Sequence, residues 1–183
     1  MEWKRRSAYV FVRTRPGMAE NVFLKVNRWD HTIGSFMTHW PWDILVWMDA
    51  ENIEETHKWV AEIRSWPEVE WTSTQPVFMG YKRDYWFWER PACAWVKIRS
   101  KTMAETYEDL KSYEWISTFS SVPGDWDCIG LVAGDSWEDV FMYMADLKSA
   151  GYEIECYTPF RWWWNESWQS RWWGAVEKIG TVP

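Results

Sequence analysis

The sequence predicts an α+β protein made of two tandem ferredoxin-like units, each with the element order β-α-β-β-α-β. Three observations support this prediction. The chain has 183 residues, of which 47% are hydrophobic, and this is enough for a sizeable core. Short motifs recur in its two halves at a constant spacing. Within each half, the apolar residues follow strand-like and helix-like periods in the same order.

The repeat is carried by three pairs of matching segments that keep the same order and an offset of 84 or 85 residues. The pairs are Met18–Glu20 with Met103–Glu105, Trp42–Asp43 with Trp126–Asp127, and Val69–Trp71 with Ile154–Cys156. A constant offset over three pairs indicates that one structural unit is present twice. We therefore predict a first unit over residues 1–88 and a second over 89–183, each ending in a tryptophan-rich arm.

The first copy opens with a β-branched and aromatic segment at 8–14, which is typical of a strand. A helix is expected at 16–28, where Pro16 lies near the start. Its apolar residues at helical spacing are Ala19, Val22, Phe23 and Val26. Two strands at 32–40 and 43–49 follow, joined by a tight turn at Pro41.

The first copy ends with a second helix and a fourth strand. The helix is expected at 50–66, with Ile53, Val60 and Ile63 facing inward and Pro67 stopping it. The strand is expected at 69–79.

The second copy repeats this order. Strands are expected at 93–100, 116–122, 127–133 and 152–160, and helices at 102–113 and 136–150. In the last helix, Ser136 is the expected N-cap and Gly151 the expected C-terminal stop. Its periodic apolar residues are Trp137, Val140, Phe141, Met144 and Leu147.

The third strand of copy one is apolar on both sides, since Val46 points one way and both Leu45 and Trp47 point the other. Two helices cover one face of a ferredoxin-like sheet, whereas a strand with two apolar faces is buried on both. We therefore predict that the two sheets pack face to face as a fused pseudo-dimer, similar to a dimeric α+β barrel.

The hairpin segments at 35–55 and 117–139 resemble the effector-binding (RAM) domain of Lrp/AsnC regulators. In that family, a turn ending in glycine-x-aromatic-Asp precedes an apolar strand. Gly124-Asp125-Trp126-Asp127 fits this pattern, and Pro41-Trp42-Asp43 fits without the glycine. The resemblance covers about 8–77 and 93–158. It departs from the family in its tryptophan content and its duplication within one chain. We also expect no N-terminal helix-turn-helix, since the first strand is expected to begin near residue 8.

The resemblance implies a small-molecule effector site at the two hairpins. The expected ligand-binding residues are Trp42, Asp43, Gly124, Trp126 and Asp127, with His39 nearby. Without a ligand, the two aspartates are expected to cap the hairpins by accepting backbone N–H bonds. Both interpretations of the aspartates stay open at this point.

The two arms contain most of the clustered tryptophans among the chain's 20. They follow the fourth strand of each copy, at 81–91 and 161–173, and mix indoles with arginine. The indoles could fill the core, present an aromatic surface to a partner protein or line a pocket for a planar ligand. The residues concerned are Trp86, Trp88, Trp162, Trp163, Trp164, Trp168, Trp172 and Trp173.

Composition excludes several functions. A formal net charge of -7 argues against nucleic-acid binding, and no apolar run approaches a membrane span. Cys93, Cys128 and Cys156 form no C-x-x-C pair and are expected to be buried free thiols, which fits a cytoplasmic protein. No zinc, phosphate-loop or nucleophile motif is present, so we expect no metal site and no catalytic residues.

The sequence therefore predicts a non-catalytic regulatory or accessory protein that binds a small effector and forms homo-oligomers or docks a partner protein. No cofactor is predicted. Two alternatives remain. One is a haem- or tetrapyrrole-linked enzyme that uses His31 or His39, and the other is a structural subunit that docks its partner through the arms.

Overall fold

The computed structural model describes residues 2–3, 7–39, 41–50, 52–83, 90–100, 102–165 and 167. The chain divides into two compact units. The copy-one unit holds the described residues of Arg5–Pro76 and Phe160–Pro183. The copy-two unit holds those of Met1–Lys4 and Val77–Pro159.

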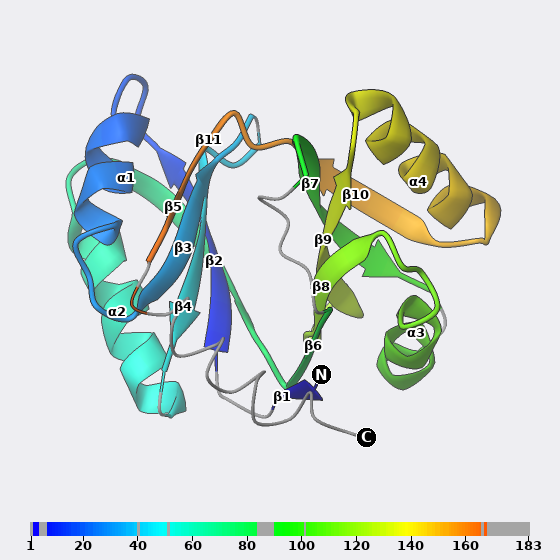
Figure 1. Cartoon of the computed structure of the whole chain (residues 1–183). Coiled ribbons are helices and arrows are strands. Elements are labelled where there is room, and N and C mark those ends of the chain that lie inside the picture. The colour runs from blue at the N-terminus through cyan, green and yellow to red at the C-terminus, as the bar shows by residue number, and fades with distance from the viewer. Residues whose placement is uncertain are drawn as a thin grey trace. The chain divides into compact units, whose positions relative to one another are not determined.

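The copy-one unit has a five-stranded sheet in the order β11-β3-β4-β2-β5, with antiparallel neighbours throughout. Its helices, α1 and α2, lie against one face of that sheet (Figure 1). The strands are β2 (Ser7–Thr14), β3 (Thr32–Met37), β4 (Ile44–Asp49), β5 (Val69–Pro76) and β11 (Arg161–Trp164). The helices are α1 (Ala19–Val26) and α2 (Ile53–Ser65).

The copy-two unit has a six-stranded sheet in the order β1-β6-β8-β9-β7-β10, also antiparallel. Helices α3 and α4 lie on one face of it (Figure 1). The strands are β1 (Glu2–Trp3), β6 (Met79–Lys82), β7 (Ala92–Arg99), β8 (Ile116–Ser121), β9 (Cys128–Gly134) and β10 (Glu153–Tyr157). The helices are α3 (Met103–Leu110) and α4 (Trp137–Ser149).

The predicted fold class, α+β with two tandem ferredoxin-like units, is confirmed. The division by contacts differs from the predicted boundary between residues 88 and 89. Strand β6 follows copy one in the sequence but pairs with β8, and β11 follows copy two but pairs with β3. Each sheet is therefore completed by a strand from the segment that follows the other copy.

Both faces of the central strands are buried, as their sequences predict. Val10, Val12 and Val46 belong to the core beneath the helices of copy one. On the opposite face, Leu45 and Trp47 are at most 1% exposed. The prediction that the third strand of copy one is buried on both faces is therefore confirmed.

The helix ends follow local sequence. Ser136 caps α4 by accepting the backbone N–H of Asp139, and Gly151 has a φ of 91° just beyond the helix. The inward position predicted for Ile53 is wrong, because this residue opens α2 and its side chain is 49% exposed. Trp137 and Phe141 also belong to the periodic set of α4 but are exposed, because the buried stripe is narrower than the periodic one.

The three cysteines are free thiols, as predicted. Cys93 and Cys128 are buried, and burial raises the pKa of Cys93 to about 12. The burial predicted for Cys156 is wrong, because this residue lies on the edge strand β10 and is exposed. Among the described helices, none has the length and apolar character needed to cross a membrane.

Candidate functional site

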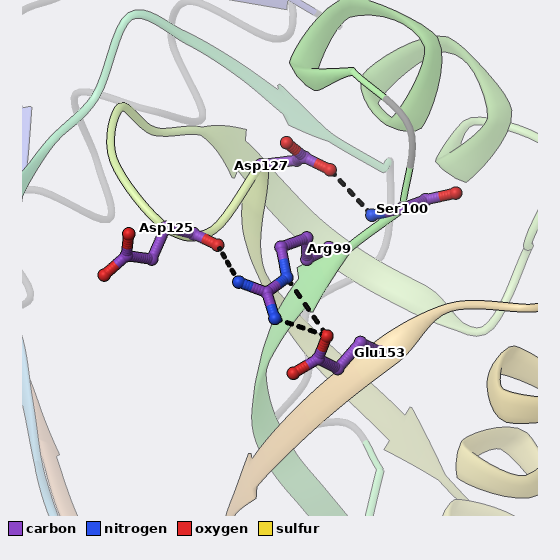
Figure 2. Close-up of polar contacts among 5 residues, drawn as sticks. All are labelled: Arg99, Ser100, Asp125, Asp127 and Glu153. Carbon is purple, nitrogen blue, oxygen red and sulfur yellow. Dashed lines mark hydrogen bonds and ion pairs between the residues drawn. The ribbon is translucent and has the colours of Figure 1, made fainter.

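The two predicted hairpin aspartates each accept one hydrogen bond from a backbone N–H and one from a threonine hydroxyl. Asp43 Oδ2 accepts the backbone N–H of Thr14 at 2.6 Å and its hydroxyl at 2.9 Å. Asp127 Oδ2 accepts the backbone N–H of Ser100 at 2.7 Å (Figure 2). The same oxygen accepts the hydroxyl of Thr106, on α3, at 3.0 Å. Each carboxylate thus ties its hairpin to the end of the first strand of its copy, which is the capping role.

The backbone at the two hairpins is also equivalent. The N–H of Asp43 donates to the Val12 carbonyl, and that of Asp127 donates to the Ile98 carbonyl, each at 3.0 Å. Gly124 has a φ of 105°, a left-handed conformation that suits glycine. Each hairpin therefore holds its Trp-Asp pair at one corner of a sheet, and we call these the copy-one corner and the copy-two corner.

The copy-one corner contains a pocket of about 400 Å³, which we call the Trp42 pocket. Its lining residues are Arg13, Pro41, Trp42, Glu70 and Trp71. Arg13 Nε lies 3.1 Å from Glu70 Oε2, with side chains 49% and 56% exposed. The Trp42 ring packs 6.0 Å from that of Phe11, while Trp71 is 64% exposed. The pocket thus combines two indoles with one cation and one anion, a composition suited to a small ligand.

The copy-two corner is organised around Arg99 (Figure 2). Arg99 donates two hydrogen bonds to Glu153 Oε2, one of them from Nε at 3.1 Å, and Nη1 donates to the Asp125 carbonyl at 3.2 Å. Its guanidinium lies 5.4 Å from the centre of the Trp126 ring. The hydrogen bonds to Glu153 are the main cause that raises the pKa of Arg99 above its ordinary value.

A buried lysine lies beside the copy-two corner, on strand β7. Lys97 is 5% exposed, and its Nζ lies 3.7 Å from Glu155 Oε2. The amine also lies 5.1 Å from the Tyr157 ring and 5.9 Å from the Trp126 ring. Burial lowers the pKa of Lys97, and the Glu155 carboxylate opposes this effect. The amine is thus held by one anion and two aromatic rings.

Of the six predicted site residues, Trp42 is the one that lines the Trp42 pocket. His39 is exposed, and its ring lies 4.9 Å from that of Phe160. Gly124 shapes the turn and has no side chain to offer a ligand. The structure therefore brings Trp42 and Asp43 to the copy-one corner, and Trp126 and Asp127 to the copy-two corner.

Three arm tryptophans lie on β11. Trp164 packs 5.7 Å from the Trp47 ring and 6.3 Å from the Phe36 ring. Trp163 packs against the core of copy one, and Trp162 is 46% exposed. The remaining arm tryptophans lie outside the described residues; they are Trp86, Trp88, Trp168, Trp172 and Trp173.

Within the described residues, no group of three or more histidine, cysteine, aspartate or glutamate side chains is placed to hold a metal ion. The charged residues of both corners belong to no motif that the sequence patterns identify as a site. These are Arg13, Glu70, Lys97, Arg99 and Glu153. The signal that could have identified the arginines is their own repeat, since each stands at the end of the first strand of its copy.

No family model matches the sequence, and no curated protein matches it. Solved structures do match. The siroheme decarboxylase NirDL is 10% identical, with 93% of this chain and 79% of that chain covered and a TM-score of 0.66. Its complex with an iron-uroporphyrin III analogue is 8% identical, with 85% of this chain and 71% of that chain covered and a TM-score of 0.64. An anthrone oxidase-like protein is 10% identical, with 88% of this chain and 94% of that chain covered and a TM-score of 0.56.

A transcriptional regulator from Neisseria meningitidis, NMB0573, solved with L-Met, matches a smaller part of the chain. It is 18% identical, with 44% of this chain and 53% of that chain covered and a TM-score of 0.36. The alignments with NirDL and the anthrone oxidase-like protein extend over both copies, and they show a shared fold.

Proposed function

We propose that this protein is a non-catalytic regulatory or accessory subunit that binds a small zwitterion of the α-amino-acid class in the Trp42 pocket. The observation that carries the proposal is the pocket itself. Two indoles form its apolar walls, and an exposed arginine–glutamate pair supplies both charges at the same place.

The pair formed by Arg13 and Glu70 suits the two charged groups of such a ligand. A guanidinium binds a carboxylate through two parallel hydrogen bonds, and a carboxylate accepts hydrogen bonds from an ammonium group. Because both side chains are about half exposed, their mutual attraction is weak, on the order of 0–1 kcal/mol. A zwitterion that inserts between them replaces this attraction with two new charge pairs.

Trp42 and Trp71 supply the apolar part of the site. Indoles offer a large flat surface that favours an aromatic or otherwise apolar ligand side chain. Asp43 acts as the positioning residue of the corner, since its Oδ2 is engaged by Thr14. By the same argument, Asp127 positions the copy-two corner through Ser100 and Thr106.

Calorimetric titration of the full chain with L-phenylalanine tests the proposal, with glycine as the comparison ligand. We expect L-phenylalanine to bind more tightly, because glycine has no side chain to contact the indoles. Arg13→Met and Trp42→Ala should each weaken binding at least tenfold, which corresponds to about 1.4 kcal/mol. Arg15→Met is the matched control, because Arg15 is an exposed arginine two positions away and should leave binding unchanged.

Two results would contradict the proposal. One is no heat of binding up to millimolar L-phenylalanine, and the other is binding that survives both Arg13→Met and Trp42→Ala. Asp127→Ala adds a check on the role of the second hairpin. If Asp127 only positions its own corner, this variant should lower the free energy of unfolding and leave binding of L-phenylalanine unchanged.

A tetrapyrrole-linked enzyme is the second candidate, and the likeness to NirDL over 93% of the chain favours it. Titration of the protein with haemin separates the two candidates. A saturable visible absorption band at one haemin per chain would support the second candidate. A spectrum equal to the sum of free haemin and protein would count against it.

A further inference from the structure

We infer that the two corners have diverged, so that the chain binds one ligand at the copy-one corner while the copy-two corner is closed by its own Arg99. Trp71 keeps the first corner open, and Glu153 holds the second one closed. This inference rests on the proposed function of the Trp42 pocket and specifies where, and how many times, that function is carried out.

Strand register identifies the two residues that differ. In copy one, β5 places Trp71 opposite Arg13 of β2. In copy two, β10 places Glu153 opposite Arg99 of β7. The predicted match of Val69–Trp71 with Ile154–Cys156 is therefore wrong in register, because the strand pairing makes Trp71 equivalent to Glu153. The two arginines are equivalent, since each lies at the end of the first strand of its copy, beside the Trp-Asp hairpin. The directly paired residue on the edge strand is therefore an indole in one corner and a carboxylate in the other.

The carboxylate fixes Arg99. Glu153 accepts two hydrogen bonds from it, the Asp125 carbonyl accepts a third, and the guanidinium lies over the Trp126 ring. A ligand carboxylate that approached Arg99 would have to displace Glu153, which is already present at the site. A flat ligand side chain would likewise compete with the guanidinium for the indole.

In copy one, the residue opposite Arg13 is Trp71, so Arg13 has a different partner from Arg99. Trp71 has no acceptor oxygen, and Arg13 instead pairs with Glu70. Glu70 is the extra residue of a β-bulge, because Val69 pairs with Thr14 and Trp71 pairs with Arg13. Within the described part of the chain, no guanidinium lies over Trp42, and the Trp42 pocket occupies the space between the two indoles and the ion pair.

The same comparison specifies the ligand. The wall that distinguishes the open corner from the closed one is Trp71, because Trp42 has a counterpart in Trp126. The side chain of the ligand is therefore the part that Trp71 recognises. Aromatic α-amino acids match this wall better than small ones. Trp71 is thus the specificity-determining residue, while Arg13 and Glu70 recognise the features that all α-amino acids share.

Calorimetry with L-phenylalanine on the full chain tests the divergence, because it measures stoichiometry as well as affinity. We expect one site per chain. Trp71→Glu copies the closed corner into copy one and should weaken binding at least tenfold. Trp71→Phe retains an aromatic wall and should stay within about threefold of the native affinity, which is under 1 kcal/mol.

The reciprocal variant, Glu153→Trp, should release Arg99 and add a second, weaker site per chain. The second site should be weaker because the residue before position 153 is Tyr152, which cannot replace the Glu70 carboxylate that accepts the ammonium group. Both positions are exposed, so the fold should tolerate these changes, and unfolding in urea verifies this for each variant. If Glu153→Trp does not fold, Glu153→Gln takes the place of that variant in the test, because it also removes the charge that holds Arg99.

The outcomes separate the two claims. Two sites in the native chain, or an Arg99→Met variant that loses as much affinity as Arg13→Met, would overturn the divergence and leave the amino-acid site standing. An unchanged affinity in Trp71→Glu would also overturn it. No binding by the native chain would overturn the proposed function and the divergence together.

Discussion

At the scale of single residues, the corners show how one side chain changes the role of its neighbours. Asp43 and Asp127 accept equivalent hydrogen bonds and keep the same local role in both copies. Arg13 and Arg99 are equally well matched in sequence, yet they have different partners, because the residue opposite each of them differs. In this chain, the duplicated Trp-Asp hairpin therefore keeps its capping contact in both copies, whereas the partners of the neighbouring arginines differ.

His31 gives a pH-dependent prediction at this scale. Its ring stacks on Trp59 with a centroid distance of 3.5 Å and an interplanar angle of 8°. Burial lowers the pKa of His31 from 6.5 to about 4, although Asp30 and Glu55 raise it. The unfolded chain therefore binds more protons than the folded chain between pH 6.5 and 4, and stability falls as pH falls through this window.

We expect this loss to be about 1–2 kcal/mol, less than the full pKa shift implies, since the ring is only partly buried. The measurement is urea unfolding at pH 7 and pH 5. His31→Phe is the matched variant, because phenylalanine keeps the stacking on Trp59 without a titratable group. The variant should lose less stability than the native chain over this range, and equal losses would contradict the assignment.

At the scale of elements, β11 shows why periodicity alone could not predict every strand. The segment 161–173 has no regular apolar period, so its sequence does not predict a strand. Its pairing partner, β3, lies far away in the sequence, and the fit depends on one glycine. A Cβ at Gly34 would lie 2.7 Å from Cε3 of Trp164, so this glycine gives the indole its place on the sheet.

Gly34→Ala tests this fit. We expect the variant to lower the free energy of unfolding by about 1–3 kcal/mol, because the new methyl group must displace the Trp164 ring or the β11 strand. In a Trp164→Ala background the same change should be close to neutral, since the obstacle is gone. Chemical unfolding of the two single variants and the double variant measures the coupling. Additive effects would show that Gly34 and Trp164 do not depend on each other.

The other elements were predictable because their patterns are local. The apolar and β-branched runs of β2 and β4 and the cap at Ser136 depend on neighbouring residues, and the structure confirms these elements. The inward face of α4 was predicted too broadly, since periodicity cannot tell how much of a stripe the sheet covers. Among the site residues, the Trp-Asp pairs were found through the repeat, whereas Glu70 and Glu153 depend on strand register and a bulge.

At the scale of the whole molecule, the exchange of β6 and β11 makes the stability of each copy depend on the other. β6 pairs with β8, and β11 pairs with β3. Cutting the chain at residue 88 would leave each copy with an exposed strand edge and without its outer strand. Exposed edges are poorly stable and prone to wrong pairing.

We therefore expect fragments 1–88 and 89–183 to unfold without cooperativity when studied separately. Mixed at equal concentration, they should form a 1:1 complex that unfolds cooperatively, because each fragment supplies the strand that the other lacks. Sedimentation and circular dichroism during urea unfolding measure both properties. A monomeric 1–88 fragment with a cooperative transition like that of the intact chain would contradict the expectation.

The reciprocal pairing of β6 and β11 also bears on how such a chain could arise or be lost. Deleting either copy would remove the outermost strand of the surviving sheet. The deletion would therefore leave the next strand of that sheet with an unpaired edge. A single-copy relative would have to borrow that strand from another molecule. An ancestor before the duplication would then have been a dimer in which each polypeptide supplied its C-terminal strand to the sheet of the other.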